Sequence, residues 1–110
     1  MLALLTFAGC ASVRDGASTG IVSHRFMHPP ERAAACFARN AEEHSSALVS
    51  EVRPPDSRGH VEVIVRVKNG VTYAIAELWP ADTGSNGTIR LAVFSSGGNR
   101  ELVRSLVEGC

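Results

Sequence analysis

Side chains that could do chemistry are sparse in this chain, and few have the spacing that a reaction needs. Glu62 and Glu77 lie in two apolar-alternating runs on either side of Asn69-Gly70. Pairing these runs as a hairpin places the two carboxylates opposite each other, where they could act as general acid and base. Because an open sheet face offers no enclosing pocket, a structural role for this pair is the default interpretation.

The chain has four histidines, His24, His28, His44 and His60. His24 and His28 have helical spacing, but Pro29-Pro30 disfavours a helix there, so no metal-ligand set is predicted. The glycine-rich segments 84–87 and 97–98 lack the lysine of a phosphate-binding loop. The sequence therefore predicts no catalytic residue, no cofactor and no metal.

Glu62 and Glu77 are positioned by the stretch from His60 to Trp79, which predicts a central hairpin. Asn69-Gly70 is the strongest short-range signal for a two-residue loop of type I′. Counting outward from this loop gives one apolar face of facing pairs: Val67 with Thr72, Val65 with Ala74, Val63 with Ala76 and Val61 with Leu78. The alanines of the second strand leave room for a helix on this face.

The elements around the hairpin predict an α+β fold. A helix opens at Pro29-Pro30-Glu31 and runs to about His44, and a strand covers 47–53. The inward face of that helix carries small residues and one ring: Ala33, Cys36, Phe37, Asn40, Ala41 and His44. A last strand covers 88–94, and a second helix follows, with Asn99 as its N-cap and Gly109 at its end.

This order predicts a two-layer sandwich of helix, four-stranded antiparallel meander and helix, with both helices on one sheet face. Residues 29–110 would form the single domain, since 110 residues leave room for one modest core. Residues 11–20 are small and polar and read as a flexible tether.

The sheet face away from the helices is the candidate partner surface. It collects apolar and charged side chains: Ile64, Arg66, Tyr73, Ile75, Glu77, Trp79, Arg90 and Phe94. Exposed apolar patches of this kind often mark partner sites. The competing interpretation is that residues 21–27, or another subunit, cover this face.

The composition indicates an ordinary globular domain and argues against nucleic-acid binding and membrane-spanning helices. Eleven Lys and Arg residues balance eleven Asp and Glu residues, and no basic stripe stands out, so a nucleic-acid partner is not expected. Hydrophobic residues make up 45% and charged residues 20% of the chain, as in an ordinary globular domain. No apolar run approaches the roughly 20 residues that a membrane-spanning helix needs.

The start of the chain suggests an anchor. Residues 1–8, MLALLTFA, are apolar, and Phe7-Ala8-Gly9-Cys10 resembles the lipobox of bacterial lipoproteins, in which the signal is cut before the cysteine and the cysteine is acylated. Phe7 stands where Leu is usual, and no basic residue precedes the run. The resemblance implies a signal peptide at 1–9, a lipidated Cys10 and a tether at 10–28. Ala11 after the cysteine implies an outer-membrane destination.

With Cys10 taken as the lipid site, Cys36 and Cys110 remain as a pair. Paired cysteines of an exported chain usually form a disulfide, and we expect one here. The alternative is two unpaired thiols; a redox role is not predicted because no Cys-x-x-Cys occurs.

Taken together, these features resemble small proteobacterial lipoproteins, a resemblance that carries over no catalytic residue. The leading hypothesis is a lipid-anchored periplasmic module that is structural or binds other proteins and is not an enzyme. Its expected partners are the membrane, through the anchor, and an envelope protein. The alternative is a small periplasmic enzyme or ligand-binding protein that uses the outer sheet face or the 80–87 loop, with a cavity lined by His60, Glu62 and Glu77. The sequence sets no oligomeric state.

Overall fold

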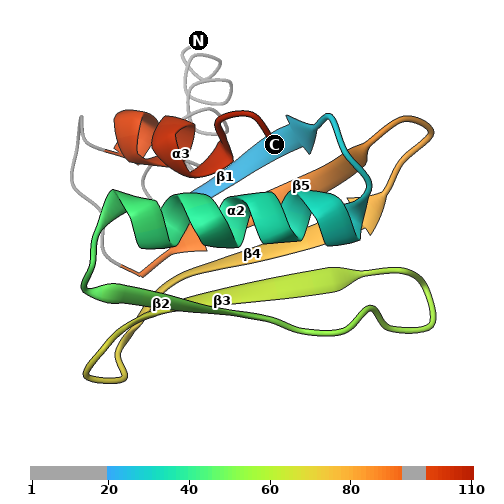
Figure 1. Ribbon diagram of the computed structural model, residues 1–110. Coiled ribbons are helices and arrows are strands. Elements are labelled where there is room, and N and C mark those ends of the chain that lie inside the picture. The colour runs from blue at the N-terminus through green and yellow to red at the C-terminus, as the bar shows by residue number, and fades with distance from the viewer. Residues whose placement is uncertain (1–19, 93–98) are drawn as a thin grey trace, which may run out of the picture.

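The computed structural model describes residues 20–92 and 99–110 and shows an α+β domain (Figure 1). Its elements, in chain order, are β1 (Ile21–Phe26), α2 (Pro30–His44), β2 (Leu48–Val52), β3 (Val61–Val67), β4 (Thr72–Pro80), β5 (Ser85–Leu91) and α3 (Asn99–Val107). The strands form one antiparallel sheet in the order β1-β5-β4-β3-β2. Helices α2 and α3 lie side by side against the sheet (Figure 1).

The predicted register of the central hairpin is confirmed over most of its length. Val61 pairs with Leu78, Val63 with Ala76 and Val65 with Ala74, so these side chains share the face that the helices cover. All six are fully buried. The alternation of valines and alanines therefore sets the helix-facing side of the sheet, as the pattern indicated.

The predicted type I′ loop is wrong, because the turn contains one more residue. The register shifts after Val65, and Arg66 pairs with Thr72. The N–H of Val67 donates to the Val71 carbonyl at 2.7 Å, and Gly70 N–H donates back to Val67 at 2.7 Å, which encloses residues 68–70. A type I′ turn needs positive φ at both central residues, but of this pair only Gly70 has it, at +103°.

The predicted four-stranded meander is also wrong in its strand count. Residues 21–26 form β1, which pairs with β5 from Ile21 opposite Arg90 to Phe26 opposite Ser85. The same pairing lengthens the last strand, which begins at Ser85 and not at residue 88. Gly87 resembles a loop residue in the sequence, but it pairs with His24 and Leu78 within this strand. Glycine suits the position because a Cβ there would meet the Phe26 ring at 2.6 Å.

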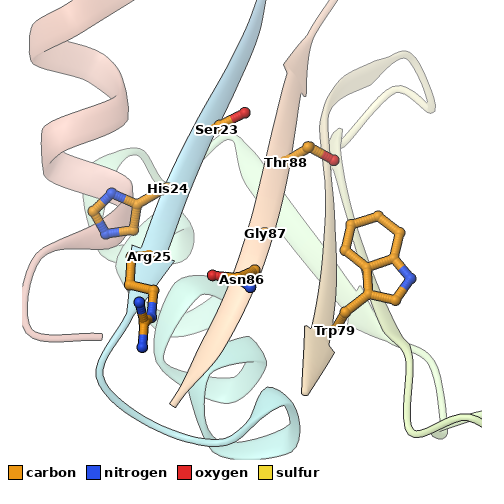
Figure 2. Close-up of a pocket in the computed structure, with 7 residues that line it drawn as sticks. All are labelled: Ser23, His24, Arg25, Trp79, Asn86, Gly87 and Thr88. Atoms are coloured by element: carbon orange, nitrogen blue, oxygen red, sulfur yellow. The ribbon is translucent and has the colours of Figure 1, made fainter. Parts of the chain in front are cut away.

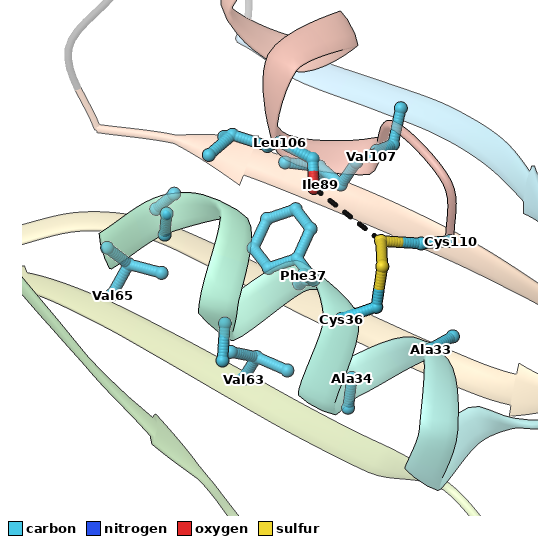
Figure 3. Close-up of a cluster of buried hydrophobic side chains, with 14 of the residues drawn as sticks. Ala33, Ala34, Cys36, Phe37, Val63, Val65, Ile89, Leu106, Val107 and Cys110 are labelled. Carbon is cyan, nitrogen blue, oxygen red and sulfur yellow. Dashed lines mark hydrogen bonds between the residues drawn. A yellow bond between two sulfur atoms is a disulfide. The ribbon is translucent and has the colours of Figure 1, made fainter. Parts of the chain in front are cut away.

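Helix α2 packs closely on the sheet because its buried face is made mainly of alanine. Ala33, Ala34 and Ala41 are fully buried, and Phe37 is the one large side chain that this face inserts into the core (Figure 3). Two residues predicted on this face are outside it, since Asn40 is half-buried and His44 is exposed. From α3, the core receives Val103, Leu106 and Val107.

The predicted disulfide is present. Cys36 of α2 and Cys110 are bonded, with their Cα atoms 5.6 Å apart (Figure 3). Asn40, one turn after Cys36, donates its side-chain amide to the carbonyls of Leu106 and Glu108, both at 2.9 Å. These carbonyls lie at the end of α3, where a helix leaves acceptors unpaired, so Asn40 caps α3 from α2. No helix in the described part of the chain is long and apolar enough to cross a membrane.

Candidate functional site

The sheet face opposite the helices, the outer face, contains side chains from all five strands. The register places together Ile21, Ser23 and Arg25 of β1, Asn86, Thr88 and Arg90 of β5, Ile75, Glu77 and Trp79 of β4, Glu62, Ile64 and Arg66 of β3, and Val49 and Glu51 of β2. The contribution of β1 was not predicted. The alternative in which residues 21–27 cover this face is wrong, because β1 extends the sheet sideways.

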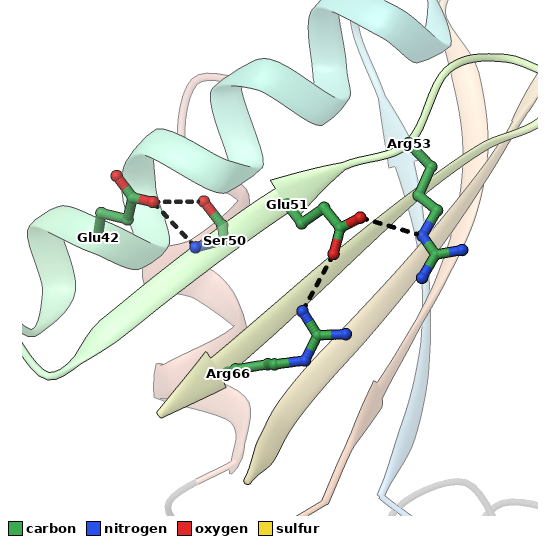
Figure 4. Close-up of polar contacts among 5 residues, drawn as sticks. All are labelled: Glu42, Ser50, Glu51, Arg53 and Arg66. Atoms are coloured by element: carbon green, nitrogen blue, oxygen red, sulfur yellow. Dashed lines mark hydrogen bonds and ion pairs between the residues drawn. The ribbon is translucent and has the colours of Figure 1, made fainter. Parts of the chain in front are cut away.

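The centre of the outer face is apolar but partly shielded. Ile64 lies opposite Ile75 on one side and Glu51 on the other, and it is only 7% exposed. Glu51 receives an ion pair from Arg66 at 3.0 Å and from Arg53 at 3.5 Å (Figure 4). All three charged side chains remain open to solvent, so these pairs contribute roughly 0–1 kcal/mol each to stability. Their main effect is to frame the isoleucine pair with charge.

Two members of the predicted patch are placed differently from the rest. Tyr73 is half-buried and packs against the helix-side core. Phe94 lies outside the described residues. Arg90 is exposed and Glu77 is half-buried. Of the predicted apolar patch, Ile64, Ile75 and Trp79 therefore lie on the described outer face, and the register adds the exposed Ile21 and Val49.

Trp79 is the large aromatic side chain at the open end of this face, and it is 38% exposed. Its ring packs against His60, with the ring centroids 4.9 Å apart and the planes tilted by 36°. The Asp56 carboxylate contacts His60 at two points. It accepts the His60 backbone N–H at 3.0 Å, and it lies 3.4 Å from the ring Nδ1. The N–H of His60 and then that of Arg58 lower the pKa of Asp56 below its ordinary value.

A shallow hollow of 380 Å³ lies between Trp79 and β1 (Figure 2). Its rim includes Ser23, Arg25, Asn86 and Thr88, and Gly87 of β5 also lines it. The Arg25 guanidinium donates to the carbonyl and the hydroxyl oxygen of Thr83, at 3.1 and 3.0 Å. The hollow thus offers an indole edge beside hydroxyl and amide groups.

His24 also borders this hollow, but Figure 2 shows its ring turned away from Trp79. The ring lies edge-on against Phe26, at a centroid distance of 4.7 Å. Partial burial lowers the pKa of His24, which favours the neutral imidazole. His24 therefore belongs to the packing between β1 and α3 more than to the outer face.

The carboxylate pair is confirmed as neighbours, since Glu62 lies directly opposite Glu77. A pocket of 20 Å³ beside Glu77 is lined by Ile21, Ile75, Thr88 and Arg90, and neither Glu62 nor His60 lines it. Within residues 20–92 and 99–110, no three His, Cys, Asp or Glu side chains gather in a way that could hold a metal ion. The arrangement suits surface contact better than acid–base chemistry.

Comparison with known proteins adds no family. No protein-family model matches the chain, and no curated protein sequence is significantly similar to it. Function is therefore inferred from the geometry of the outer face, the disulfide and the sequence.

Proposed function

We propose that this protein is a lipid-anchored module of the cell envelope that binds another protein through its outer sheet face and catalyses no reaction. The observation that carries this proposal is the Cys36–Cys110 disulfide. Such bonds persist in oxidising compartments and are rare in reducing ones. The lipobox-like Phe7-Ala8-Gly9-Cys10 supports the same location. An exported domain with a lipidated Cys10 would sit at the periplasmic face of the outer membrane.

The binding role rests on Trp79 and its surroundings. Aromatic side chains supply large contact areas and dominate interface energies once they are buried. Trp79 is exposed at one end of the outer face, where His60 packs against the indole. Glu77 is the next residue of β4 on the same face, and Ile75 and Arg90 lie opposite each other two residues farther along. A partner that buries this end would gain an aromatic anchor with a charged rim.

The anchor is tested by metabolic labelling of the full-length chain. The wild type should partition with membranes and incorporate radiolabelled palmitate. The Cys10→Ser variant should do neither, because the acyl chains need that sulfur. A wild type that stays soluble and unlabelled would remove the lipoprotein part of the proposal.

The partner surface is tested by site-specific cross-linking in native envelopes, followed by binding measurements on the partner so identified. Trp79→Ala should weaken that binding by about 2 kcal/mol or more. The matched control is Val71→Ala, which truncates an apolar side chain that is 57% exposed at the hairpin loop, away from Trp79. Equal affinity of the wild type and Trp79→Ala would count against the outer face as the binding surface.

A ligand-binding role is the second candidate, and the hollow beside Trp79 favours it. Ser23, Asn86 and Thr88 present hydroxyl and amide groups within reach of the indole, the combination that small polar ligands use. The predicted 80–87 loop is shorter than expected, since residues 85–87 belong to β5. Trp79 fluorescence during titration with candidate ligands would separate this role from protein binding.

A further inference from the structure

The sheet has two edges, β2 and β1, and their outward backbone groups differ in how they are paired. On β2, the register with β3 turns the N–H groups of Leu48, Ser50 and Val52 away from the sheet. Ser45 accepts the Leu48 N–H at 3.1 Å, and the Glu42 carboxylate accepts the Ser50 N–H at 2.9 Å (Figure 4). The β2 edge is therefore largely closed to another strand.

The β1 edge is open over its central part. The Leu91 N–H donates to the Gly20 carbonyl at 2.8 Å, and this bond shows which β1 residues are hydrogen-bonded to β5 and which are not. By the antiparallel alternation, the N–H groups of Ile21, Ser23 and Arg25 then point away from β5. No hydrogen-bond partner for these N–H groups lies among the described residues. The next outward donor, Met27 N–H, is closed by the Cys110 carbonyl at 3.0 Å.

The side chains of β1 do not guard this edge. Natural edge strands are often protected by proline, lysine or a bulge, and IVSHRF contains none of these. Arg25 is held by its hydrogen bonds to Thr83, and it also lines the hollow between β1 and the end of α3. Ile21 is 37% exposed. An extended strand could therefore pair with β1 without displacing a contact of the described chain.

We propose that β1 pairs with β1 of a second copy of this chain, about a twofold axis through Ser23, so that the two sheets become one. In this register Ser23 faces itself and Ile21 faces Arg25, so no like charges are directly opposed. Each outward N–H would donate to an outward carbonyl of the other strand. The contact is the same on both copies and closes as a dimer, which uses both β1 edges and leaves only the largely closed β2 edges outside.

The charge pattern of α3 favours a second copy over an unrelated strand. A hollow of 410 Å³ between β1 and the end of α3 is lined by His24 and Met27 and by the exposed Arg104 and Glu108. Neither Arg104 nor Glu108 forms an ion pair with a described residue. A twofold axis through β1 would run the two α3 helices antiparallel, which brings Arg104 of one copy toward Glu108 of the other. A second copy supplies this complementarity by symmetry.

The oligomeric state of the full chain tests this proposal, with Cys10→Ser included to remove a thiol that could cross-link. Sedimentation across a concentration series should show a reversible dimer. Ser23→Pro removes an outward N–H, together with the hydroxyl on the outer face, without breaking a β1–β5 hydrogen bond, and edge strands tolerate proline at such positions. It should raise the dissociation constant at least about tenfold. Val52→Pro makes the same change at an outward position of the β2 edge and should leave the dimer intact. A monomeric parent chain, or a dimer unaffected by Ser23→Pro, would overturn the proposal.

Cross-linking tests the register and does not depend on how Ser23→Pro folds. Facing residues of a hydrogen-bonded antiparallel pair have Cα atoms about 5.5 Å apart, within the range of a disulfide. Ser23→Cys should therefore give an oxidised intermolecular dimer. Asn86→Cys, exposed on the neighbouring strand, is the control and should stay monomeric. Equal cross-linking at both positions would refute the register. A monomer whose Ser23 amide resists hydrogen exchange would mean that the same chain covers the edge, and this too would overturn the proposal.

Discussion

Breaking the bond between Cys36 and Cys110 should destabilise the domain by several kcal/mol. The two cysteines are 74 residues apart. The loop-closure entropy removed from the unfolded chain by a bridge of this span is worth about 4.5 kcal/mol at 25 °C. Residual structure in the unfolded state lowers that figure, so we expect a loss of about 3–4 kcal/mol. Because small domains are stable by about 5–15 kcal/mol, such a loss would leave the reduced form close to unfolding.

The contacts around the bond indicate which part of the fold survives reduction. Asn40 donates to the end of α3 and Leu106 is fully buried, and neither contact needs the bond between the two sulfur atoms. The reduced protein should therefore keep the native fold at low denaturant. Its loss of stability should come mainly from the freer unfolded chain, which predicts a higher m-value on reduction.

Urea unfolding of one preparation, oxidised and reduced, measures this effect without changing the sequence. Cys10→Ser in the background prevents exchange with a third thiol. Far-ultraviolet circular dichroism at zero urea checks that both forms are folded. A difference in unfolding free energy below about 1 kcal/mol would refute the entropic argument. Collapse of the fold at zero urea would show that the bond holds the native state together directly.

Three further perturbations follow from individual contacts. Asn40→Ala should cost about 1–3 kcal/mol in chemical denaturation because it leaves the carbonyls at the end of α3 unpaired, and a change under 0.5 kcal/mol, the usual range for surface positions, would count against the cap. Gly84→Ala should cost more than Gly70→Ala by about 1–3 kcal/mol in thermal unfolding, since both positions have positive φ but a Cβ at Gly84 would overlap the Phe26 carbonyl. The hydroxyl and then the N–H of Ser50 lower the pKa of Glu42, so its stabilisation is present at neutral pH and is lost as the pH falls below the ordinary glutamate pKa of 4.5 and through the lowered pKa of the folded state. Glu42→Gln should flatten that part of the urea midpoint against pH, and the neighbouring exposed Glu43→Gln should not.

The sequence predicted the hairpin register, both helices and the disulfide because each depends on a local or countable signal. Alternating valines fix a strand face, alanines at helical spacing fix a helix face, and the two cysteines that remain once Cys10 is taken as the lipid site allow one pairing. The prediction of the turn type was wrong because the register shift after Val65 sets the loop length. No residue type in the sequence indicates this bulge.

The fifth strand was missed for a different reason. The alternation of residues 21–26 is weak, since the helix-facing positions hold Val22, His24 and Phe26 beside polar neighbours. Its partner is almost seventy residues later in the chain (Ile21 opposite Arg90), where Ser85-Asn86-Gly87 resembles a loop. Only the close contact between Gly87 and the Phe26 ring explains why glycine is suitable there. As a result, the hollow beside Trp79, which β1 and β5 line together, could not be predicted.

The segment around Cys110 ties together parts of the chain that are made at very different times. Its carbonyl accepts the N–H groups of Met27 and His28, and its sulfur is bonded to Cys36. During synthesis, α2 and the hairpin can form from neighbouring residues, whereas β1 must wait for β5 and the covalent link must wait for Cys110 itself. The emerging chain therefore stays incompletely locked until Cys110 has been made. A protein that must cross a membrane unfolded would benefit from this order, because its most stable form is reached only after passage.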